Sequence, residues 1–232
     1  MRLLIHVEGR TEEDFVRETL SWHLAGCGYS AVSARLIGGA KTRARRGGVR
    51  PWKVVRKSIV THLKQDESVV STTMVDYYGL PGDWPECTRR TGSPVERAES
   101  IEEALLRDVC ASMGPGFRSD RFVPNLVVHE FEALLFSDCK TFGRAIDQPD
   151  MSQRMEEIRA RFGEPEKIDD SPDTAPSKRI ASLVSHYEKR LHGNLAAMEI
   201  GVERMREACP HFRRWLEKLE SLPKLVARER EA

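Results

Sequence analysis

The chain has 232 residues, 40% of them hydrophobic, and its 37 basic and 36 acidic residues leave a formal net charge of +1. This composition supports one hydrophobic core with room for a helical appendage, and the net charge by itself indicates no partner. Five scattered cysteines without C-x-x-C spacing indicate reduced thiols rather than a disulfide framework or a zinc site. No apolar run approaches the roughly 20 residues that span a bilayer, and the first residues do not resemble a signal peptide. We therefore expect a cytoplasmic protein without membrane contact.

The first part of the chain alternates between predicted strands and helices. Residues 3–7 form an apolar run that predicts a buried strand. Thr11 is a candidate N-cap for the next helix, whose apolar spacing continues to Leu24. Residues 31–37 predict the second strand, and the glycine- and arginine-rich residues 38–50 predict a flexible loop.

The same alternation continues through the middle of the chain. A helical stripe covers residues 52–63, and residues 69–77 predict the third strand. A helix is expected to start at Ser93 or Ser100, and residues 122–129 predict the fourth strand. Strands that alternate with helices favour a mostly parallel sheet with helices on both faces, which is an α/β fold.

Beyond the fourth strand the pattern becomes helical. Residues 130–136 predict a short helix or turn, and only helical patterns follow. We expect an α/β part at residues 1–137 and a helical part at residues 138–232 that packs on it, so that the two make one structural unit.

Acidic residues stand where three predicted strands end. Glu8 follows the first strand, Asp76 closes the third, and Glu130 follows the fourth. Because the carboxyl ends of parallel strands lie on one edge of a sheet, these carboxylates are expected to converge there, with Glu132 close by. Carboxylate oxygens are the ligands that Mg²⁺ and Mn²⁺ prefer, and one or two such ions support phosphate chemistry. The pattern predicts a divalent-metal site.

Each of these residues also has an ordinary structural interpretation. Glu12 can favour the positive end of a helix, and Asp76 can form an Asx turn. Glu130 and Glu132 can pair with arginines, and a histidine such as His129 is more often structural than a ligand. The combination at several strand ends is more specific than any single residue.

Basic residues cluster between positions 41 and 57, without an acidic residue among them. They are Lys41, Arg43, Arg45, Arg46, Arg50, Lys53, Arg56 and Lys57. This density predicts contacts with the DNA or RNA backbone and little sequence preference, because no base-reading motif accompanies it. The ordinary interpretation is a solvated loop followed by a charged helix face. Trp52 could stack on a base, but its place in the helical stripe favours core packing.

A further candidate anion site lies late in the chain. Ser177 is a candidate N-cap, which would put Lys178 and Arg179 in the first turn of a helix. The helix dipole disfavours cations there, and a bound phosphate would reverse this effect. A surface loop is an equally good interpretation.

These segments together resemble a known fold. Residues 7–12, VEGRTE, look like the first signature of the TOPRIM fold of topoisomerases, bacterial primases and nucleases of the overcoming-lysogenization-defect (OLD) type. Residues 76–81, 129–136 and 176–179 resemble more narrowly one bacterial TOPRIM-like family, the domain of unknown function four-two-seven-six. The likeness runs from residue 1 to about residue 215 and so covers most of the chain.

The resemblance implies a Rossmann-like TOPRIM sheet with Mg²⁺ or Mn²⁺ at its edge. Glu8 would be a catalytic acid/base or metal ligand, and Asp76 a ligand of Mg²⁺. Glu130 or Glu132 would be the later acidic residue, and Lys178 the late lysine, of OLD-type nucleases. The candidate catalytic residues are thus Glu8, Glu12 and Lys178, the candidate metal ligands are Glu8, Asp76, Glu130 and Glu132, and Arg179 joins the basic residues as a nucleic-acid contact.

One departure from the family pattern concerns the metal site. The usual second signature is Asp-x-Asp, and its third position here is Tyr78. This removes one ligand, so that Glu130, Glu132 or Asp83 replaces it, or the site is weakened. Relatives are often encoded beside an ATPase in phage-defence operons, which makes an ATPase a candidate partner; this chain has no phosphate-binding loop of its own.

Three functions are compatible with these features. The first is a metal-dependent nuclease acting on DNA or RNA. The second is a non-catalytic TOPRIM-like module, disabled by the change at Tyr78, that binds nucleic acid or a partner protein. The third is a nucleotidyl or phosphoryl transferase, which would bind a nucleotide near Lys178.

Overall fold

Five parallel strands form the sheet of the computed structural model, which describes residues 1–37, 48–89, 91–168 and 174–231, with side chains to residue 226. The strands are β1 (Arg2–Val7), β2 (Ala31–Leu36), β3 (Val69–Asp76), β4 (Phe122–Val123) and β5 (Leu126–Val127). Their order is β2-β1-β3-β4, and β5 pairs with the end of β3. All pairings are parallel, which confirms the predicted α/β class.

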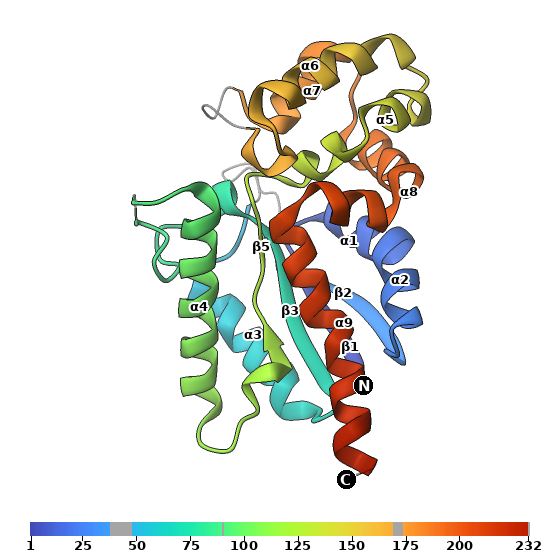
Figure 1. Cartoon of the computed structure of the whole chain (residues 1–232). Helices are drawn as coiled ribbons and strands as arrows, with labels where there is room; N and C mark the ends of the chain where they lie inside the picture. The colour runs from blue at the N-terminus through green and yellow to red at the C-terminus, as the bar shows by residue number, and fades with distance from the viewer. Residues whose placement is uncertain (38–47, 90, 169–173, 232) are drawn as a thin grey trace.

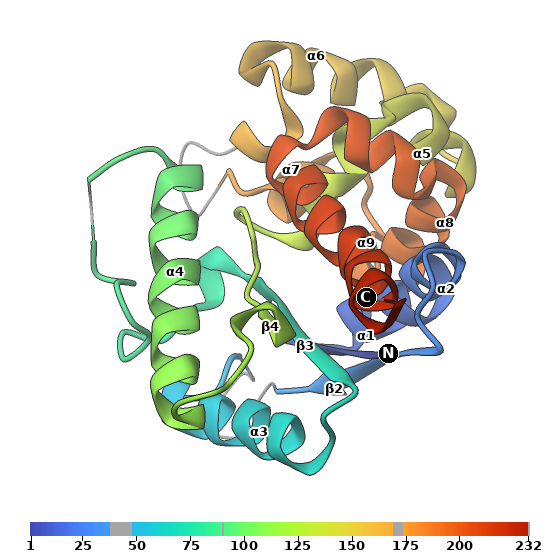
Figure 2. The ribbon, with the colours of Figure 1, turned by 60° about the horizontal axis from the view of Figure 1, so that its bottom comes forward.

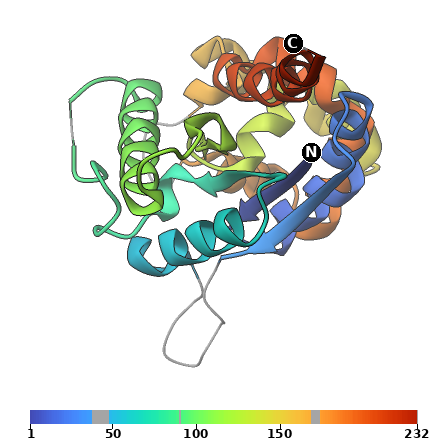
Figure 3. The same cartoon turned by 90° about the horizontal axis from the view of Figure 1, so that it is seen from below.

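Helices cover both faces of this sheet, as Figure 3 shows from below. Ile5 and Met74 point to the face covered by α1 (Arg10–Phe15), α2 (Ser21–Gly26), α8 (Lys189–Ala208) and α9 (Pro210–Glu231). Val75 points to the opposite face, covered by α3 (Trp52–Gln65) and α4 (Pro94–Met113). A π-helical turn, η1 (Val16–Leu20), joins α1 to α2 without a break. The two faces follow from the alternation of side chains along each strand.

Further helices gather beyond the carboxyl ends of the strands (Figure 1). They are α5 (Cys139–Ala145), α6 (Ser152–Phe162), α7 (Pro176–Leu183) and the first part of α8, which bends at Gly201 where φ is 75°. Short helices join them: η4 (Phe131–Ser137), η5 (Pro149–Met151) and η6 (Pro165–Lys167). From this end α9 runs back along the sheet between α4 and α2 (Figure 2). Among the described helices, none has the length and apolar character that crossing a membrane requires.

The helical part shares its core with the sheet. Phe142 of α5, Ile180 of α7 and Ala196 of α8 belong to the same hydrophobic cluster as Ile5 of β1. All four side chains are fully buried. The cap on the carboxyl edge is therefore held by continuous apolar packing, which fixes the loops that end the strands.

The predicted strand at residues 122–129 is interrupted. Pro124 follows β4, and a proline has no backbone N–H for a ladder hydrogen bond. The Thr73 hydroxyl bridges the gap: it accepts a hydrogen bond from the Asn125 N–H (2.9 Å) and donates one to the Asn125 carbonyl (2.7 Å). The expectation of one continuous strand was wrong at this point, and a side chain of β3 replaces the missing ladder contact.

One predicted helix start is confirmed. Ser93 is the N-cap of α4, and its hydroxyl accepts a hydrogen bond from the Glu96 N–H (3.2 Å). The Glu96 carboxylate accepts one from the Ser93 N–H in return (2.7 Å). This reciprocal pair is a capping box, which the sequence S-x-x-E encodes locally.

Two other predicted N-caps were wrong by two residues. The N-cap of α1 is Gly9 rather than Thr11, and the Gly9 N–H donates to the Glu12 carboxylate (2.9 Å). The N-cap of α7 is Ala175 rather than Ser177, because a proline occupies the first helical position. In both cases the backbone N–H groups of the helix start are used by carboxylates instead of by a Ser or Thr hydroxyl.

A carboxylate also fixes the start of α9. Glu166 of η6 is buried, and its two oxygens accept hydrogen bonds from the N–H groups of His211 (2.8 Å) and Phe212 (2.9 Å). The first N–H groups of a helix have no partner within the helix. Glu166 thus supplies the cap that aligns α9 on the sheet.

We expect Glu166→Ala to lower the free energy of unfolding by about 2 kcal/mol, because two buried N–H groups lose their acceptor. Glu164→Ala is the matched control, since Glu164 lies two residues away and its side chain is exposed. Urea denaturation of the three chains measures the difference. Equal losses for Glu166→Ala and Glu164→Ala would contradict the capping role.

Candidate functional site

The carboxyl ends of β1 and β3 bring two acidic residues to the same edge of the sheet. β1 and β3 are direct neighbours, with Val7 opposite Met74, so Glu8 and Asp76 follow at the end of this pairing. The negative charges of Glu8, Glu12 and Glu132 all raise the pKa of Asp76, behind the larger effect of burial. The strand-end carboxylates are thus close enough to raise the pKa of Asp76, and their convergence on one metal ion stays a prediction.

Asp76 is held by a backbone group from across the sheet edge. It is buried, and its Oδ1 accepts a hydrogen bond from the Phe131 N–H (3.0 Å) at the start of η4. Its other oxygen, Oδ2, lies 3.8 Å from Lys189 Nζ. Burial raises the pKa of Asp76 well above the usual range of an aspartate, and the nearby Lys189 charge opposes this rise.

Glu132 and Lys189 form the ion pair at the centre of the site. Glu132 is fully buried, and its Oε2 lies 2.8 Å from Lys189 Nζ. Burial raises the pKa of Glu132, and the Lys189 charge and hydrogen bond partly offset this effect. Burial alone would lower the pKa of Lys189, but the charges of Asp76, Glu132 and Glu12 outweigh it and raise that pKa. Lys189 therefore stays charged at any ordinary pH.

Glu8 is a partly buried acid at the end of β1 whose negative charge is poorly compensated. Its Oε2 is shielded from solvent and has no hydrogen-bond partner in the described residues. Burial raises the pKa of Glu8 to about 7, and the neighbouring charge of Glu12 contributes to the rise. Gly79, in the short helix η2 (Tyr77–Gly79), lies so close that a Cβ atom there would be 2.9 Å from Glu8 Oε2. A glycine at this position leaves space for the Glu8 carboxylate.

Glu12 and Glu130 are both held by helix starts. Glu12 is buried and accepts from the Gly9 N–H, which is the structural role considered for it. The Glu130 Oε2 accepts a hydrogen bond from the Ser177 N–H (3.0 Å) in the first turn of α7. An anion does sit at this helix start, and in this structure it is the carboxylate of Glu130.

Two lysines near this edge have different surroundings. Lys178, the candidate catalytic lysine, is exposed on α7, one residue after Ser177. Lys189, which the sequence argument did not select, contacts the carboxylates. The sequence did contain a signal for Lys189. Lys189 and Arg190 are cations in the first turn of α8, where the helix dipole disfavours them, just as Lys178 and Arg179 are in α7. Only the packing of the two helices distinguishes them.

Tyr78 and His129 form a stacked pair beside the acidic residues. The ring centroids are 5.2 Å apart, and the Tyr78 side chain is 42% exposed. Burial lowers the pKa of His129 to about 4, so its ring is neutral at physiological pH. His129 has a φ of 68°, a left-handed conformation that turns the chain sharply before η4. Asp83 is exposed and accepts a hydrogen bond from the Trp52 N–H (2.9 Å) at the start of α3.

Half of the predicted basic cluster lies outside the described residues, namely Lys41, Arg43, Arg45 and Arg46. Arg50, Lys53 and Lys57 are exposed at the start of α3. Arg56 is paired with Asp108 of α4 (2.8 Å), and Trp52 is buried and donates to the same carboxylate, which confirms its core position. The Arg179 guanidinium lies over the ring of Phe162, 4.9 Å from its centroid.

The carboxylates fit a hard divalent cation in chemistry, but they do not enclose one. Glu8 Oε2 and Glu132 Oε1 are buried acceptors without a hydrogen-bond donor, which is the kind of oxygen that Mg²⁺ takes as a ligand. Among the described residues, however, no three oxygens of these acids lie within 4.8 Å of one another. The acids thus lie along the edge, and three of them would have to move closer to one another to hold an ion between them.

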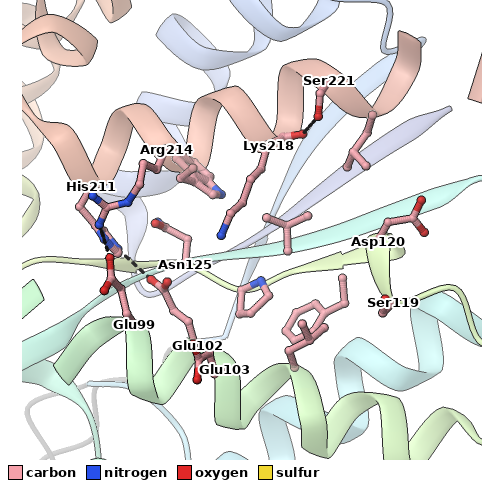
Figure 4. A pocket seen from close by; sticks show the side chains of 16 residues that line it. Glu99, Glu102, Glu103, Ser119, Asp120, Asn125, His211, Arg214, Lys218 and Ser221 are labelled. Carbon is pink, nitrogen blue, oxygen red and sulfur yellow. Dashed lines mark hydrogen bonds and ion pairs between the residues drawn. The ribbon is translucent and has the colours of Figure 1, made fainter. Parts of the chain in front are cut away.

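A cavity of about 460 Å³ lies elsewhere, between α4 and α9 (Figure 4). Its lining includes the buried pair Glu102 and His211, joined at 2.8 Å, and Asn125 and Lys218. None of the acidic residues at the strand ends contributes to it. The candidate site is therefore the charged carboxyl edge of the sheet rather than the interior of this cavity.

A parallel α/β sheet with a buried acidic carboxyl edge and a helical cap defines the class of this protein. Residues 7–220 match the family described as Domain of unknown function (DUF4276), and the chain belongs to this family, as the sequence indicated. Among solved structures, it is similar to the C-terminal region of the OLD protein of Xanthomonas campestris pv. campestris, with 15% identity, 98% coverage of both chains and a TM-score of 0.45. A comparison with curated proteins found no match.

We expect Glu8→Gln to stabilise the metal-free chain at pH 8. Because the pKa of Glu8 rises from 4.5 to about 7 on folding, the folded chain holds this proton more tightly than the unfolded chain. The resulting stability is complete below about pH 4.5 and is lost as the pH rises through 7. Glutamine carries no charge, so the variant avoids this loss, which is on the order of 1–3 kcal/mol.

Urea denaturation in the presence of a chelator, at pH 5 and pH 8, measures this effect. The gain should be large at pH 8 and small at pH 5. Glu13→Gln is the control, because Glu13 lies in the first turn of α1, five residues after Glu8, and pairs with Arg10 (2.5 Å). A gain that is equal at both pH values would show that Glu8 does not titrate as described.

Proposed function

We propose that this protein is a metal-dependent nuclease that hydrolyses phosphodiester bonds in DNA or RNA. The observation that supports this most is the excess of buried carboxylate at the strand ends, with Glu8 Oε2 lacking any hydrogen-bond donor. Burying such groups without a compensating cation is unfavourable, and Lys189 supplies only one positive charge. The resemblance of residues 7–12 to the first TOPRIM signature is consistent with the same function.

Mg²⁺ or Mn²⁺ would be held by Glu8 and Asp76, with Glu132 or Glu130 completing the ligand set. A bound ion of this kind activates water and stabilises the charge that develops on a phosphoryl group. In the metal-free chain the pKa of Glu8 is about 7, and an ion bound to Glu8 would favour the ionised carboxylate and release this proton. Asp76 is oriented by the Phe131 N–H and needs no rearrangement to keep that contact.

Lys189 would stabilise negative charge at the same place. It remains protonated, and its side chain is 38% exposed, so that one end of the ion pair reaches solvent. A cation held against Glu132 and Asp76 is in position to contact a phosphate that approaches the edge. In this proposal Lys189 has the electrostatic role that the sequence argument gave to Lys178.

Cations at the start of α3 would contact the nucleic-acid backbone. In a parallel β–α–β arrangement the helix that follows a strand begins at the carboxyl edge of the sheet, so Arg50 and Lys53 lie on the same side as the acidic residues. Both are exposed, as is Lys57 one turn later. Contacts of this type supply affinity and depend on salt, with little dependence on sequence.

One observation favours a second candidate, a non-catalytic module that binds nucleic acid or a partner protein. The Lys189 ammonium already compensates the charge of Glu132, and Tyr78 stands where the family pattern has a second aspartate. A site whose acids are satisfied by an internal lysine can keep its fold without an ion. This candidate predicts binding without metal-dependent turnover.

We expect Glu8→Gln and Asp76→Asn each to reduce Mg²⁺- or Mn²⁺-dependent cleavage by at least about 100-fold, because each removes a charged ligand from the edge. Binding to the same DNA or RNA, measured by fluorescence anisotropy, should change little. Glu13→Gln should retain full cleavage, since its carboxylate faces Arg10. Undiminished cleavage in both site variants would contradict the proposed site. Binding without any cleavage in the wild type would favour the non-catalytic module.

We expect Gly79→Ala to weaken Mn²⁺ binding about tenfold while leaving the melting temperature nearly unchanged. The added Cβ would lie 2.9 Å from Glu8 Oε2, and the flexible carboxylate would swing away from the edge. Gly82→Ala is the control in the same loop, because a Cβ there meets no atom within 4 Å. Titration calorimetry with Mn²⁺ compares the three chains, and equal affinities would exclude Glu8 as a ligand.

A further inference from the structure

A second group of potential metal ligands lies where α2 and α9 meet, apart from the acidic edge. His23 belongs to α2, Cys27 follows its last turn, and Glu220 belongs to α9. One ligand atom from each residue, an imidazole nitrogen, the thiol sulfur and a carboxylate oxygen, lies within 4.8 Å of the others. It is the one such group in the described part of the chain.

The backbone of this region is already fixed. The Tyr29 hydroxyl donates to the Leu219 carbonyl (2.8 Å), and it is buried. Gly28 has a φ of 107°, and a Cβ there would lie 3.1 Å from the ring of Pro223. These contacts press the end of α2 against α9, so the three ligands are brought together by the fold and not by chance side-chain positions.

The ligands also lie in a negatively charged environment. His23 Nε2 is 2.7 Å from Glu220 Oε1, and Glu203 Oε1 is 3.7 Å from His23 Nδ1. Glu217 is the third carboxylate nearby, 3.8 Å from Arg206. Arg206 pairs with Glu220 (3.0 Å) and compensates part of this charge. A carboxylate has two oxygens, so Glu220 can keep Arg206 on one of them while the other binds an ion.

We propose that His23 Nε2, Cys27 Sγ and the Glu220 carboxylate bind one Zn²⁺ ion. Nitrogen, sulfur and oxygen donors are the ligands that zinc accepts, at about 2.0–2.3 Å each. Tetrahedral binding needs these atoms about 3–4 Å apart, so small side-chain rotations within the observed spacing suffice. The group is half-buried, with 21% of the His23 side chain exposed, and water completes the fourth position.

Binding is an exchange of protons for the ion. The Cys27 thiol loses its proton to solvent and binds as the thiolate. His23 gives up its hydrogen bond to Glu220 and binds through Nε2 as the tautomer with its ring proton on Nδ1, so that the Nε2 proton moves to Nδ1 through solvent. Glu203 is the positioning residue, because a carboxylate near Nδ1 holds the imidazole with Nε2 toward the ion.

Such a site would join the end of α2, near the start of the chain, to α9, near its end. The sequence expectation excluded zinc because the cysteines lack paired spacing, and that argument does not detect a site made from residues 197 positions apart. Without an ion, Glu220 bonds with His23 and Arg206, and the Cys27 thiol donates to the His23 carbonyl (3.4 Å). The experiment must distinguish these two states.

Co²⁺ is the probe that distinguishes them, because a thiolate ligand gives it an intense near-ultraviolet charge-transfer band. The full chain, cleared of metal with a chelator, is titrated with Co²⁺ and then with Zn²⁺. We expect a sulfur-dependent band that saturates at one equivalent and disappears when Zn²⁺ displaces Co²⁺. Cys27→Ser should abolish it, whereas Cys110→Ser, at another half-buried cysteine, should not.

Three further arms make the result decisive. Glu203→Gln should weaken the site about tenfold without loss of the band, as expected for a positioning residue. Zn²⁺ should protect Cys27 of the wild type from iodoacetamide, which needs no variant and no folding control. The same band in Asp76→Asn would show that it does not arise at the acidic edge. A wild type without the band, or with unprotected Cys27, would overturn the zinc site and leave the nuclease proposal untouched.

Discussion

The ion pair of Lys189 with Glu132 and Asp76 is the interaction on which the carboxyl edge of the sheet depends. Five acidic residues influence one another there, and one ammonium group reaches two of them directly. An isolated carboxylate in such surroundings would be strongly unfavourable. Burial and the neighbouring carboxylates raise the pKa of Glu8 to about 7, so that Glu8 is partly protonated near neutral pH, whereas the Lys189 charge opposes the rise of the pKa of Asp76. The net charge of the acidic edge is thus lowered both by Lys189 and by the proton on Glu8.

The remaining negative charge is balanced by backbone N–H groups at the starts of helical segments. Glu12 accepts from the N–H of the N-cap residue of α1. Asp76 accepts from the first N–H of η4, and Glu130 accepts from an N–H in the first turn of α7. Helix starts carry a partial positive charge, so each contact stabilises an ionised carboxylate and also fixes its direction. The helical cap is consequently part of the site, because η4, α7 and α8 supply the donors and the lysine that the sheet lacks.

The limits of sequence reasoning follow from the range of these contacts. The ends of β1 and β3, and with them Glu8 and Asp76, could be predicted because an apolar run and the rule for parallel strands are local information. The capping box of Ser93 is local too. The contact of Lys189 with Asp76, that of Ser177 with Glu130, and the break at Pro124 bridged by Thr73 all join segments more than 45 residues apart. Nothing in the spacing of residues along the chain indicates which helix start meets which carboxylate.

A catalytic site and a non-catalytic scaffold differ here in whether a divalent ion displaces the protons of the acidic residues. Raised pKa values at Glu8 and Asp76 mean that the ionised forms are disfavoured and that each acid binds a proton more readily than usual, and both functions tolerate that condition. A divalent ion would favour the ionised acids and so release those protons, drawing the carboxylates inward from their present open arrangement. Lys189 opposes this change as long as it alone satisfies Glu132, because a second cation must share that carboxylate with it. The function of the edge therefore depends on whether the attraction of Glu8 and Asp76 for an ion exceeds the repulsion between that ion and Lys189.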